Sequence, residues 1–238
     1  MLALSERGTQ LSNFIDTFLN YIAPHQCILC AAPSSAALCT ACYPSLPRWE
    51  ASNSCPRCGH INTQGHLCGA CQTAPPAFDR TYAAFLYTEP ISSLIQAAKF
   101  ANRWSLLPPL GAYLAQITPE EQRPNRLIAL PLHPARLRER GFNQAVEIAR
   151  PIAKLHQLPL EIDTLQRIKN TEHQARLNAN ARWQNMRGAF VYSGNLTGQR
   201  VAIIDDVMTS GASLNAAAKA LKLAGAIEVQ AWVVARTP

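Results

Sequence analysis

Four pairs of cysteines constrain the fold of this chain more than any other feature of its sequence. All eight cysteines lie between residues 27 and 71 of a 238-residue chain, and two residues separate the members of each pair. The pairs are Cys27 and Cys30, Cys39 and Cys42, Cys55 and Cys58, and Cys68 and Cys71. Two residues between thiolates let the backbone turn so that both sulfurs face one metal, and two such turns complete a tetrahedral zinc site. The spacing therefore predicts two zinc ions.

The spacing leaves the grouping of the cysteines open. In a sequential arrangement the first four residues bind one zinc and the last four bind the other, but a crossed arrangement fits the same spacing. Disulfides are disfavoured because nothing in the sequence directs the chain to an oxidising compartment, and iron–sulfur proteins use other spacings. His60 and His66 are expected to be exposed. Four thiolate ligands leave no open position for a substrate, so both metals are expected to be structural.

After Pro75 and Pro76 the pattern changes to alternating strands and helices. Strands are expected at 81–87, 127–132, 160–165, 189–192, 200–205 and 228–235, and helices at 91–101, 107–117, 143–156, 178–183 and 214–224. Such alternation predicts an α/β fold with a doubly wound, mostly parallel sheet. Pro151 is expected to interrupt and kink its helix.

Three segments are expected along the chain. Apolar residues recur at helical spacing between Leu11 and Ile22 and end at Pro24, so residues 1–24 are predicted to hold an amphipathic helix. Residues 25–76 are predicted to form a small double zinc-ribbon domain, and residues 77–238 the α/β domain.

The positive charge is concentrated in one stretch. Twelve Lys or Arg and five Asp or Glu lie between Arg123 and Phe190. The net charge of this stretch is +7, which equals the net charge of the whole chain. This block suits a partner that carries phosphate, either a small ligand or a nucleic-acid backbone. No apolar run is long enough to span a membrane, and no secretory signal is evident, so a cytoplasmic protein without membrane contact is expected.

Residues 201–213 combine an apolar strand, two acids, a loop of small polar residues and the start of a helix. Backbone N–H groups at a helix start, together with hydroxyl groups, form a pocket for a phosphate. The predicted phosphate-binding residues of this segment are Thr209, Ser210, Gly211, Ala212 and Ser213. Asp205 and Asp206 are suited to hydrogen-bond a ribose diol and to help hold hydrated Mg²⁺, and they are the predicted catalytic residues.

This segment resembles the phosphoribosyl pyrophosphate signature of type I phosphoribosyltransferases, and the chain as a whole resembles the ComF family, also called GntX. In that family a zinc-knuckle N-terminus precedes such a domain. The segments that carry the resemblance are Cys27-Ile28-Leu29-Cys30, Lys99-Phe100, Leu130-Pro131-Leu132-His133-Pro134, Arg140-Gly141-Phe142-Asn143-Gln144, the series Thr171, Gln174, Arg182 and Asn185 ending in Gly188-Ala189-Phe190, and Asp205–Ser213.

The resemblance implies further site residues and partners. Loop His133–Gly141 resembles the pyrophosphate loop, and Arg167–Gln174 resembles the flexible hood loop that closes over the ligand. The phosphate-binding residues implied outside the signature are Arg136, Arg138, Arg140 and Lys99. The implied ligand is phosphoribosyl pyrophosphate with Mg²⁺. The implied role is the cytoplasmic handling of DNA taken up during natural transformation, with single-stranded DNA and DNA-processing proteins as partners.

One departure leaves the reaction open. Purine-salvage relatives place an acid where Thr209 stands, so purine salvage is not expected and the acceptor is unknown. Three interpretations remain: a phosphoribosyltransferase with an unknown nucleophile, a DNA-utilization protein that binds without turnover, and an interaction module whose ribbons dock a partner and whose pocket is vestigial.

Overall fold

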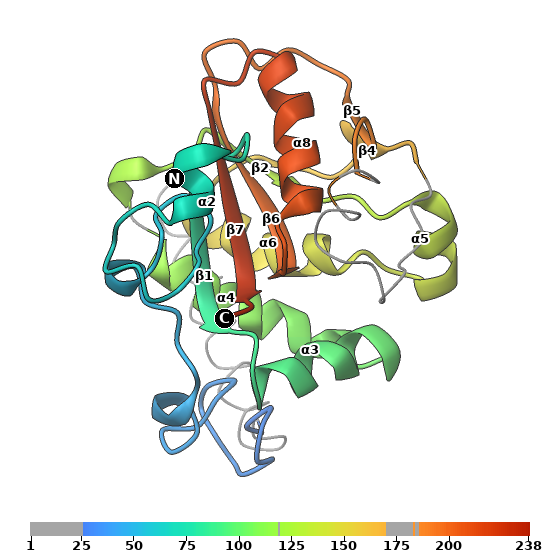
Figure 1. Ribbon diagram of the computed structural model, residues 1–238. Coiled ribbons are helices and arrows are strands. Elements are labelled where there is room, and N and C mark those ends of the chain that lie inside the picture. The colour runs from blue at the N-terminus through green and yellow to red at the C-terminus, as the bar shows by residue number, and fades with distance from the viewer. Residues whose placement is uncertain (1–25, 119, 170–182, 184–185) are drawn as a thin grey trace, which may run out of the picture. The chain divides into compact units, whose positions relative to one another are not determined.

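The computed structural model describes residues 26–118, 120–169, 183 and 186–238 (Figure 1). The predicted helix between Leu11 and Ile22, most of the predicted hood loop and the helix expected at 178–183 lie largely outside the described residues. The chain divides into two compact units, Met1–Leu46 and Pro47–Pro238. No helix within the described ranges is long and apolar enough to cross a membrane.

The described residues of the first unit, 26–46, contain the first cysteine group and little regular structure. Gln26 and Pro33 form an isolated antiparallel bridge around the first cysteine pair, and the 3-10 helix η1 spans Tyr43–Ser45. Cys27 and Leu38 are buried, at 2% and 3% exposure. So small a core is consistent with folding that depends on a metal.

A five-stranded parallel sheet forms the centre of the second unit, in the order β1-β7-β6-β2-β3. Its strands are β1 (Arg80–Leu86), β2 (Arg126–Ala129), β3 (Leu160–Glu161), β6 (Arg200–Met208) and β7 (Glu228–Arg236). A separate antiparallel pair consists of β4 (Leu165–Arg167) and β5 (Phe190–Tyr192). This topology confirms the predicted α/β class with a parallel sheet.

Helices cover both faces of the sheet (Figure 1). The helices around the sheet are α3 (Ile91–Phe100), α4 (Leu107–Ile117), α5 (Pro134–Arg140), α6 (Gln144–His156) and α8 (Ala212–Leu223). Trp232 of β7 makes an edge contact with His156 of α6, whereas its neighbours Ala231 and Val233 belong to the core cluster that includes Leu214 of α8. Because neighbouring strand residues point to opposite faces, α6 and α8 lie on opposite sides of the sheet.

The second cysteine segment packs on the sheet within the second unit. The Trp49 indole N–H donates to the carbonyl of Gly59 at 2.9 Å, and the Thr81 N–H of β1 donates to the carbonyl of Pro56 at 3.2 Å. Gly59 has a φ of +70°, and a Cβ there would lie 2.9 Å from Thr81 Cγ2. The segment thus shares the core of the sheet, and the domain boundary expected at residue 76 lies inside one compact unit, which begins at Pro47.

Helix α5 (Pro134–Arg140) replaces the loop expected between His133 and Gly141. His133 caps the helix, since its Nδ1 accepts from the N–H of Ala135 at 3.3 Å, and Gly141 ends it in a left-handed conformation. Proline at the first position and glycine just past the end are ordinary helix signals. The loop prediction was wrong because it did not take these signals at the two ends of the segment into account.

Two further boundaries differ from expectation. Helix α6 continues through Pro151 rather than being interrupted by it, because the buried residues Ala145, Ile148 and Ile152 hold the helix against its neighbours despite the missing N–H. The strand expected at 160–165 is divided into β3 and β4, and the second of these leaves the central sheet.

Candidate functional site

The carboxyl ends of β2 and β6 form the topological switch point of the sheet. The chain leaves β6 through α8 toward β7 on one side, and leaves β2 through α5 and α6 toward β3 on the other. Pairing between the two strands ends at Ala129 and Ile204, while β6 continues to Met208. In open parallel sheets, ligands bind in the crevice that such a divergence creates. The topology therefore places the candidate site where β6 continues beyond β2.

Asp205 and Asp206 lie at this crevice, within β6 rather than after it. Asp206 is 3% exposed, and its Oδ2 lies 2.5 Å from Lys99 Nζ of α3. Burial lowers the pKa of Lys99, but attraction to Asp206 outweighs burial and leaves that pKa raised. The structure thus brings Lys99 and the acidic pair together, although their sequence separation exceeds 100 residues.

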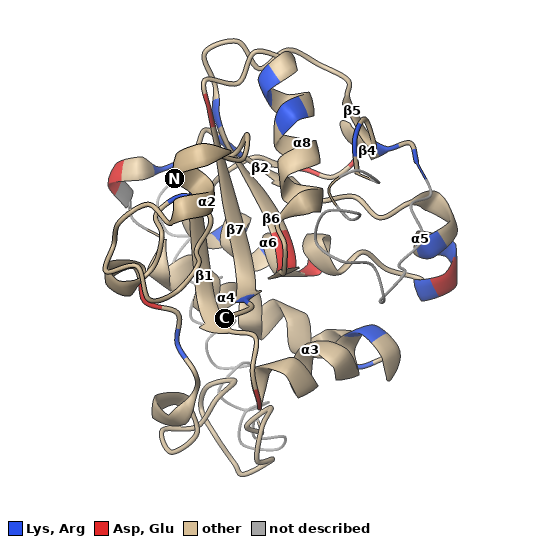
Figure 2. Ribbon diagram, in the orientation of Figure 1, with Lys and Arg blue, Asp and Glu red and all other residues tan. Residues whose placement is uncertain are grey.

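Arginines surround the acidic pair. Burial lowers the pKa of Arg140, and the charges of Asp206 and Asp205 act in the opposite direction, so this guanidinium lies within electrostatic range of both acids. Arg140 also donates to Gln144 Oε1 at 2.7 Å and lies over the Phe100 ring, 5.8 Å from its centroid. Figure 2 shows this arrangement as red at the carboxyl end of β6 and blue on α3 and α5.

Helix α5 separates the three predicted arginines into two groups. Arg136 and Arg140 are four residues apart and share one face of the helix. The charge of Arg136 acts on the pKa of both Arg140 and Arg167, which places it beside the site. Arg138 is exposed, and its position two residues from each of the others puts it on a different face. The structure therefore supports Arg136 and Arg140 as site residues more than Arg138.

Arg167 is a site residue that the sequence did not single out, beyond its membership of the expected hood loop. It ends β4, and burial lowers its pKa while the charge of Asp205 acts to raise it. Its guanidinium also lies over the Phe190 ring, 5.8 Å from the centroid. A basic residue at the end of a short strand carries no motif, so only the fold reveals that β4 delivers it to the acidic pair.

The loop between β6 and α8 offers backbone donors beside the carboxylates. Gly211 is the N-cap of α8 with a φ of +74°, and α8 has twelve residues and no side-chain cap. The first N–H groups of such a helix have no partner within the helix, and the helix dipole favours an anion there. Thr209 is exposed, and Ser210 and Ser213 are half-buried, whereas Gly211 and Ala212 are buried. The start of α8 thus offers N–H groups to an anion at the segment where the sequence predicts a phosphate-binding loop.

The pKa of Asp205 predicts an unusual dependence of stability on pH. Burial and the adjacent Asp206 raise this pKa from 3.8 to about 8. The unfolded chain releases the proton near pH 4, so stability falls as the pH rises from about 4 to about 8, by at most about 1.4 kcal/mol per pH unit. We expect Asp205→Asn to remove this loss and to unfold at higher denaturant concentration than the wild type at pH 8. Urea unfolding at pH 6.5 and pH 8 tests this, and an unchanged difference between the two pH values contradicts it.

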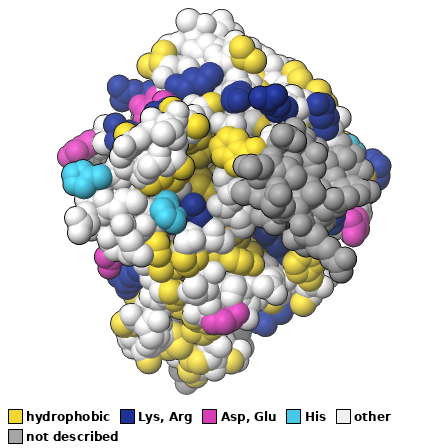
Figure 3. All heavy atoms as spheres, viewed as in Figure 1, with side chains coloured by type: hydrophobic (Ala, Val, Ile, Leu, Met, Phe, Trp, Pro, Cys, Tyr) yellow, Lys and Arg dark blue, Asp and Glu magenta, His cyan; other side chains and the backbone are white. Residues whose placement is uncertain are grey.

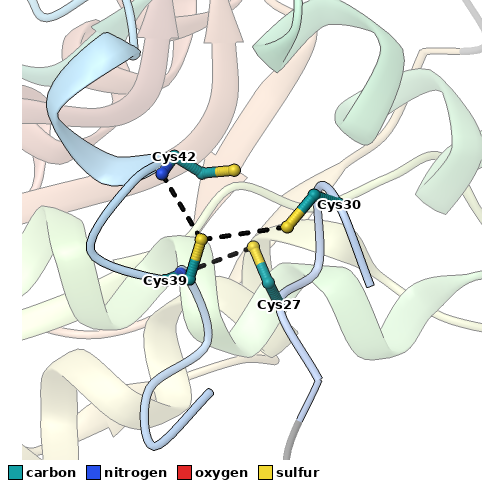
Figure 4. Close-up of side chains that lie close together, drawn as sticks. All are labelled: Cys27, Cys30, Cys39 and Cys42. Carbon is teal, nitrogen blue, oxygen red and sulfur yellow. Dashed lines mark hydrogen bonds between the residues drawn. The ribbon is translucent and has the colours of Figure 1, made fainter. Parts of the chain in front are cut away.

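The cysteines form two separate groups of four, in the sequential order. Within Cys27, Cys30, Cys39 and Cys42, and within Cys55, Cys58, Cys68 and Cys71, all sulfurs lie within 4.8 Å of one another. Figure 4 shows the first group, in which the N–H of Cys39 donates to Cys27 Sγ at 3.4 Å. The same bond recurs in the second group, from the N–H of Cys68 to Cys55 Sγ at 3.4 Å. The crossed arrangement is thereby excluded, and His60 and His66 are exposed.

At least one cysteine of each group has a lowered thiol pKa, whereas hydrogen bonds to neighbouring cysteines raise the pKa of Cys42, and burial raises the pKa of Cys58 and Cys71. Burial opposes ionisation of Cys27, but backbone N–H groups, including those of Cys30 and Cys39, lower the pKa of its thiol to about 6. The equivalent bonds lower the pKa of Cys55 to about 7. Four thiolates at tetrahedral spacing fit Zn²⁺.

We expect two zinc equivalents per chain in a reduced preparation, and elemental analysis that finds one or none would contradict this.

Comparison with known proteins decides the family. The chain is 32% identical over 224 residues to DNA utilization protein YhgH of Shigella flexneri, which covers 90% of this chain and 98% of that protein. It is 32% identical over 227 residues to competence protein F of Haemophilus influenzae, which covers 89% of this chain and 96% of that protein. The chain belongs to the ComF family. A ComF-family protein of Streptococcus pneumoniae, competence protein ComFC, is 24% identical over 204 residues, covering 84% of this chain and 88% of that protein.

The double zinc ribbon domain family matches residues 18–72 of this ComF-family chain, in agreement with the two groups of four cysteines. The chain thus contains a double zinc ribbon with two structural zinc sites. Among solved structures, the chain is similar to the glutamine phosphoribosylpyrophosphate amidotransferase of B. subtilis, with 22% identity and a TM-score of 0.38 over 54% of this chain and 26% of that chain. It is also similar to a purine phosphoribosyltransferase of Pyrococcus horikoshii, with 18% identity and a TM-score of 0.33 over 51% of this chain and 66% of that chain.

Proposed function

We propose that this ComF-family protein binds phosphoribosyl pyrophosphate with Mg²⁺ in the crevice at the carboxyl ends of β2 and β6. The observation that carries the proposal is the convergence of two carboxylates, four cations and an uncapped helix start at one switch point. The ligand's ribose offers a diol to the carboxylates, and its phosphate and pyrophosphate offer anions to the cations and the helix start. Each charged group of the ligand then has a partner of opposite charge.

Two groups of residues bind the two phosphate-bearing ends of the ligand in this arrangement. The start of α8 and the Thr209–Ser213 loop bind the 5′-phosphate. Arg136 and Arg140, from the segment after β2, face the pyrophosphate. In phosphoribosyl transfer the bond between C1 of the ribose and the pyrophosphate oxygen breaks, the electron pair leaves with pyrophosphate, and a nucleophile supplies the new pair to C1. Positive charge at the leaving group favours this step because negative charge develops there.

The acidic pair has the chemistry that Mg²⁺ requires. Mg²⁺ takes oxygen ligands, keeps several waters and is bound through one or two carboxylates together with substrate phosphates. Because the pKa of Asp205 is raised, a metal cation bound beside this carboxyl group would favour its ionisation. Asp205 and Asp206 would hold the ion, whose chemistry there is to neutralise phosphate charge.

The acceptor has to be nucleophilic without a general base at position 209. Thr209 cannot act as a general base at neutral pH, because a hydroxyl group lacks a suitable pKa.

The family includes proteins named for competence and for DNA utilization. We therefore place the reaction, or the binding without turnover, in the cytoplasmic handling of imported DNA, where DNA-processing proteins are expected partners.

Calorimetry and a pyrophosphate-release assay test this function. We expect phosphoribosyl pyrophosphate to bind only when Mg²⁺ is present. Release of pyrophosphate with an acceptor from a screen of nucleobases, nucleosides and amines identifies a transferase, whereas tight binding without release identifies a protein that binds the ligand without turnover. Equal, weak heat with and without Mg²⁺ would refute the assignment of the site.

Binding of single-stranded DNA is a second candidate function, favoured by a groove lined by α8 and by residues Trp183, Met186 to Gly188 and Phe190. The groove has a volume of about 380 Å³ and includes Trp183, Arg187 and Lys219 in its lining. Figure 3 shows Lys and Arg side chains beside exposed hydrophobic ones over α8. Aromatic rings that stack on bases, next to cations that contact phosphates, are the usual features of sites for single strands.

The salt dependence of DNA binding distinguishes this groove from α5. Each lost phosphate contact lowers the salt slope for single strands by about 0.7. We expect Arg187→Ala with Lys219→Ala to lower the slope by roughly 1.4, and Arg136→Ala with Arg138→Ala to lower it by less, because Arg136 faces the ligand crevice. Fluorescence polarisation of a labelled oligonucleotide over a range of salt concentrations measures both slopes. If only the α5 pair changes the slope, DNA binds at α5 instead.

A further inference from the structure

Arg236 connects the second cysteine group to the end of β6. This arginine ends β7 and is 8% exposed. Its Nε donates to the carbonyl of Cys58 at 2.9 Å, and its Nη1 donates to the carbonyl of Met208 at 3.3 Å. Met208 is the last residue of β6 and directly precedes the phosphate loop. One buried side chain thus bonds to a predicted zinc ligand residue and to the residue from which the phosphate loop starts.

A cavity makes this connection important for the position of the loop. The cavity has a volume of about 430 Å³, and its lining includes Cys58, Cys71, Ser210, Gly211 and Arg236. Ser210 and Gly211 line this cavity together with the cysteine knuckle, and Arg236 links the two walls. Thr237 supports the link, because its carbonyl accepts from Arg236 Nη1 at 2.6 Å and its N–H donates to the carbonyl of Met208 at 3.1 Å. A guanidinium holds such a position well, since its donors form a rigid planar fork.

The negative charge of the second zinc site also attracts the guanidinium of Arg236. Four thiolates around Zn²⁺ carry a formal excess of two negative charges, and Cys58, Cys68 and Cys55 all attract this guanidinium. Residues that bond to metal ligands fix the orientation of those ligands and are part of the metal site. The charge of the zinc site therefore holds Arg236 beside Cys58, in the position from which its Nη1 also donates to the carbonyl of Met208.

We propose that Arg236 is a positioning residue through which the second zinc site holds the phosphate loop in its binding conformation. The second zinc then supports ligand binding directly, in addition to stabilising its ribbon, and loss of this zinc releases the loop. The inference rests on the proposed function for the identity of the ligand, but not for the coupling between zinc and loop.

Hydrogen exchange at the end of the phosphate loop, at the Asn215 N–H that donates to the carbonyl of Gly211 at 2.8 Å, measures the coupling without any ligand. We expect Arg236→Met to retain two zinc equivalents, to speed this exchange about tenfold, as loss of a charge-assisted hydrogen bond does, and to weaken binding of phosphoribosyl pyrophosphate by a similar factor. The control is Arg80→Met, which removes an arginine of β1 that pairs with Glu228 at 3.4 Å. Exchange of the Asn215 N–H in Arg236→Met that equals its exchange in Arg80→Met overturns the proposal.

Removal of zinc provides a second test, which holds even if Arg236→Met does not fold. In a Cys27→Ser background the first site is disabled, so a chelator removes zinc from the second site alone. We expect exchange of the Asn215 N–H to rise in step with the zinc released. We also expect Arg236→Lys, which keeps the charge but not the planar fork, to show faster exchange there before chelation. Exchange of this N–H that does not follow zinc release overturns the coupling. If the coupling holds while phosphoribosyl pyrophosphate fails to bind the wild type, only the proposed ligand is wrong.

Discussion

Replacing both acids of the crevice, by Asp205→Asn with Asp206→Asn, is expected to weaken Mg²⁺-dependent binding of phosphoribosyl pyrophosphate by at least about 100-fold. Each carboxylate would lose a charge-assisted hydrogen bond to the ribose diol, and such bonds contribute about 1.5–3 kcal/mol each. The site would also lose the charge that attracts the metal. Calorimetry at fixed Mg²⁺ concentration measures the change in affinity.

The control for this result is a variant with the same change in charge at exposed positions, Glu50→Gln with Glu121→Gln. It is expected to bind as the wild type does. The double asparagine variant leaves Lys99 without its ion-pair partner, so circular dichroism has to show that it is folded. Asp205→Asn alone retains that pair and is expected to lose at least tenfold in affinity while gaining stability at pH 8. Wild-type affinity in the double variant would move the ligand away from this crevice.

The sequence indicates the residues of local motifs at the candidate site, but not the residues that other elements bring to it. The acidic pair, the phosphate loop and the cysteine pairs are local patterns, and each could be read because residues near in sequence act together. Lys99 was found only through the family resemblance. The sequence does not indicate that Arg167 lies within electrostatic range of Asp205, because nothing near it shows that β4 leaves the central sheet.

The packing of the second ribbon shows a different limit. Cysteine spacing reveals which residues can share a metal, but not which surface then covers a sheet. The residues that join the ribbon to the sheet are Trp49, Phe78, Thr81 and Arg236, and they lie outside the cysteine motif. Their side chains are apolar or internally bonded, as core residues generally are, so the sequence does not distinguish them from the rest of the core.

This packing leads to the second large effect, a difference between the two zinc sites. Cys55→Ser is expected to destabilise the whole second unit, by about 5 kcal/mol or more, because a structural zinc site contributes more than that to folding and this one shares the core of the sheet. Cys27→Ser is expected to leave the second unit folded, because Cys27 belongs to the first unit. Separate cores for the ribbon and the sheet would have predicted that the sheet survives both substitutions.

Tryptophan fluorescence can measure the two cases separately. All four tryptophans, at positions 49, 104, 183 and 232, follow Pro47 and lie in the second unit, so their emission reports on that unit alone. We expect the urea midpoint of this signal to fall steeply in Cys55→Ser and to stay within error of the wild type in Cys27→Ser, although each variant retains one zinc site. Equal midpoints in the two variants would mean that the second ribbon unfolds without the sheet. The contacts of Trp49 with Gly59 and of Arg236 with Cys58 would then contribute little to stability, and the two zinc sites would be equivalent.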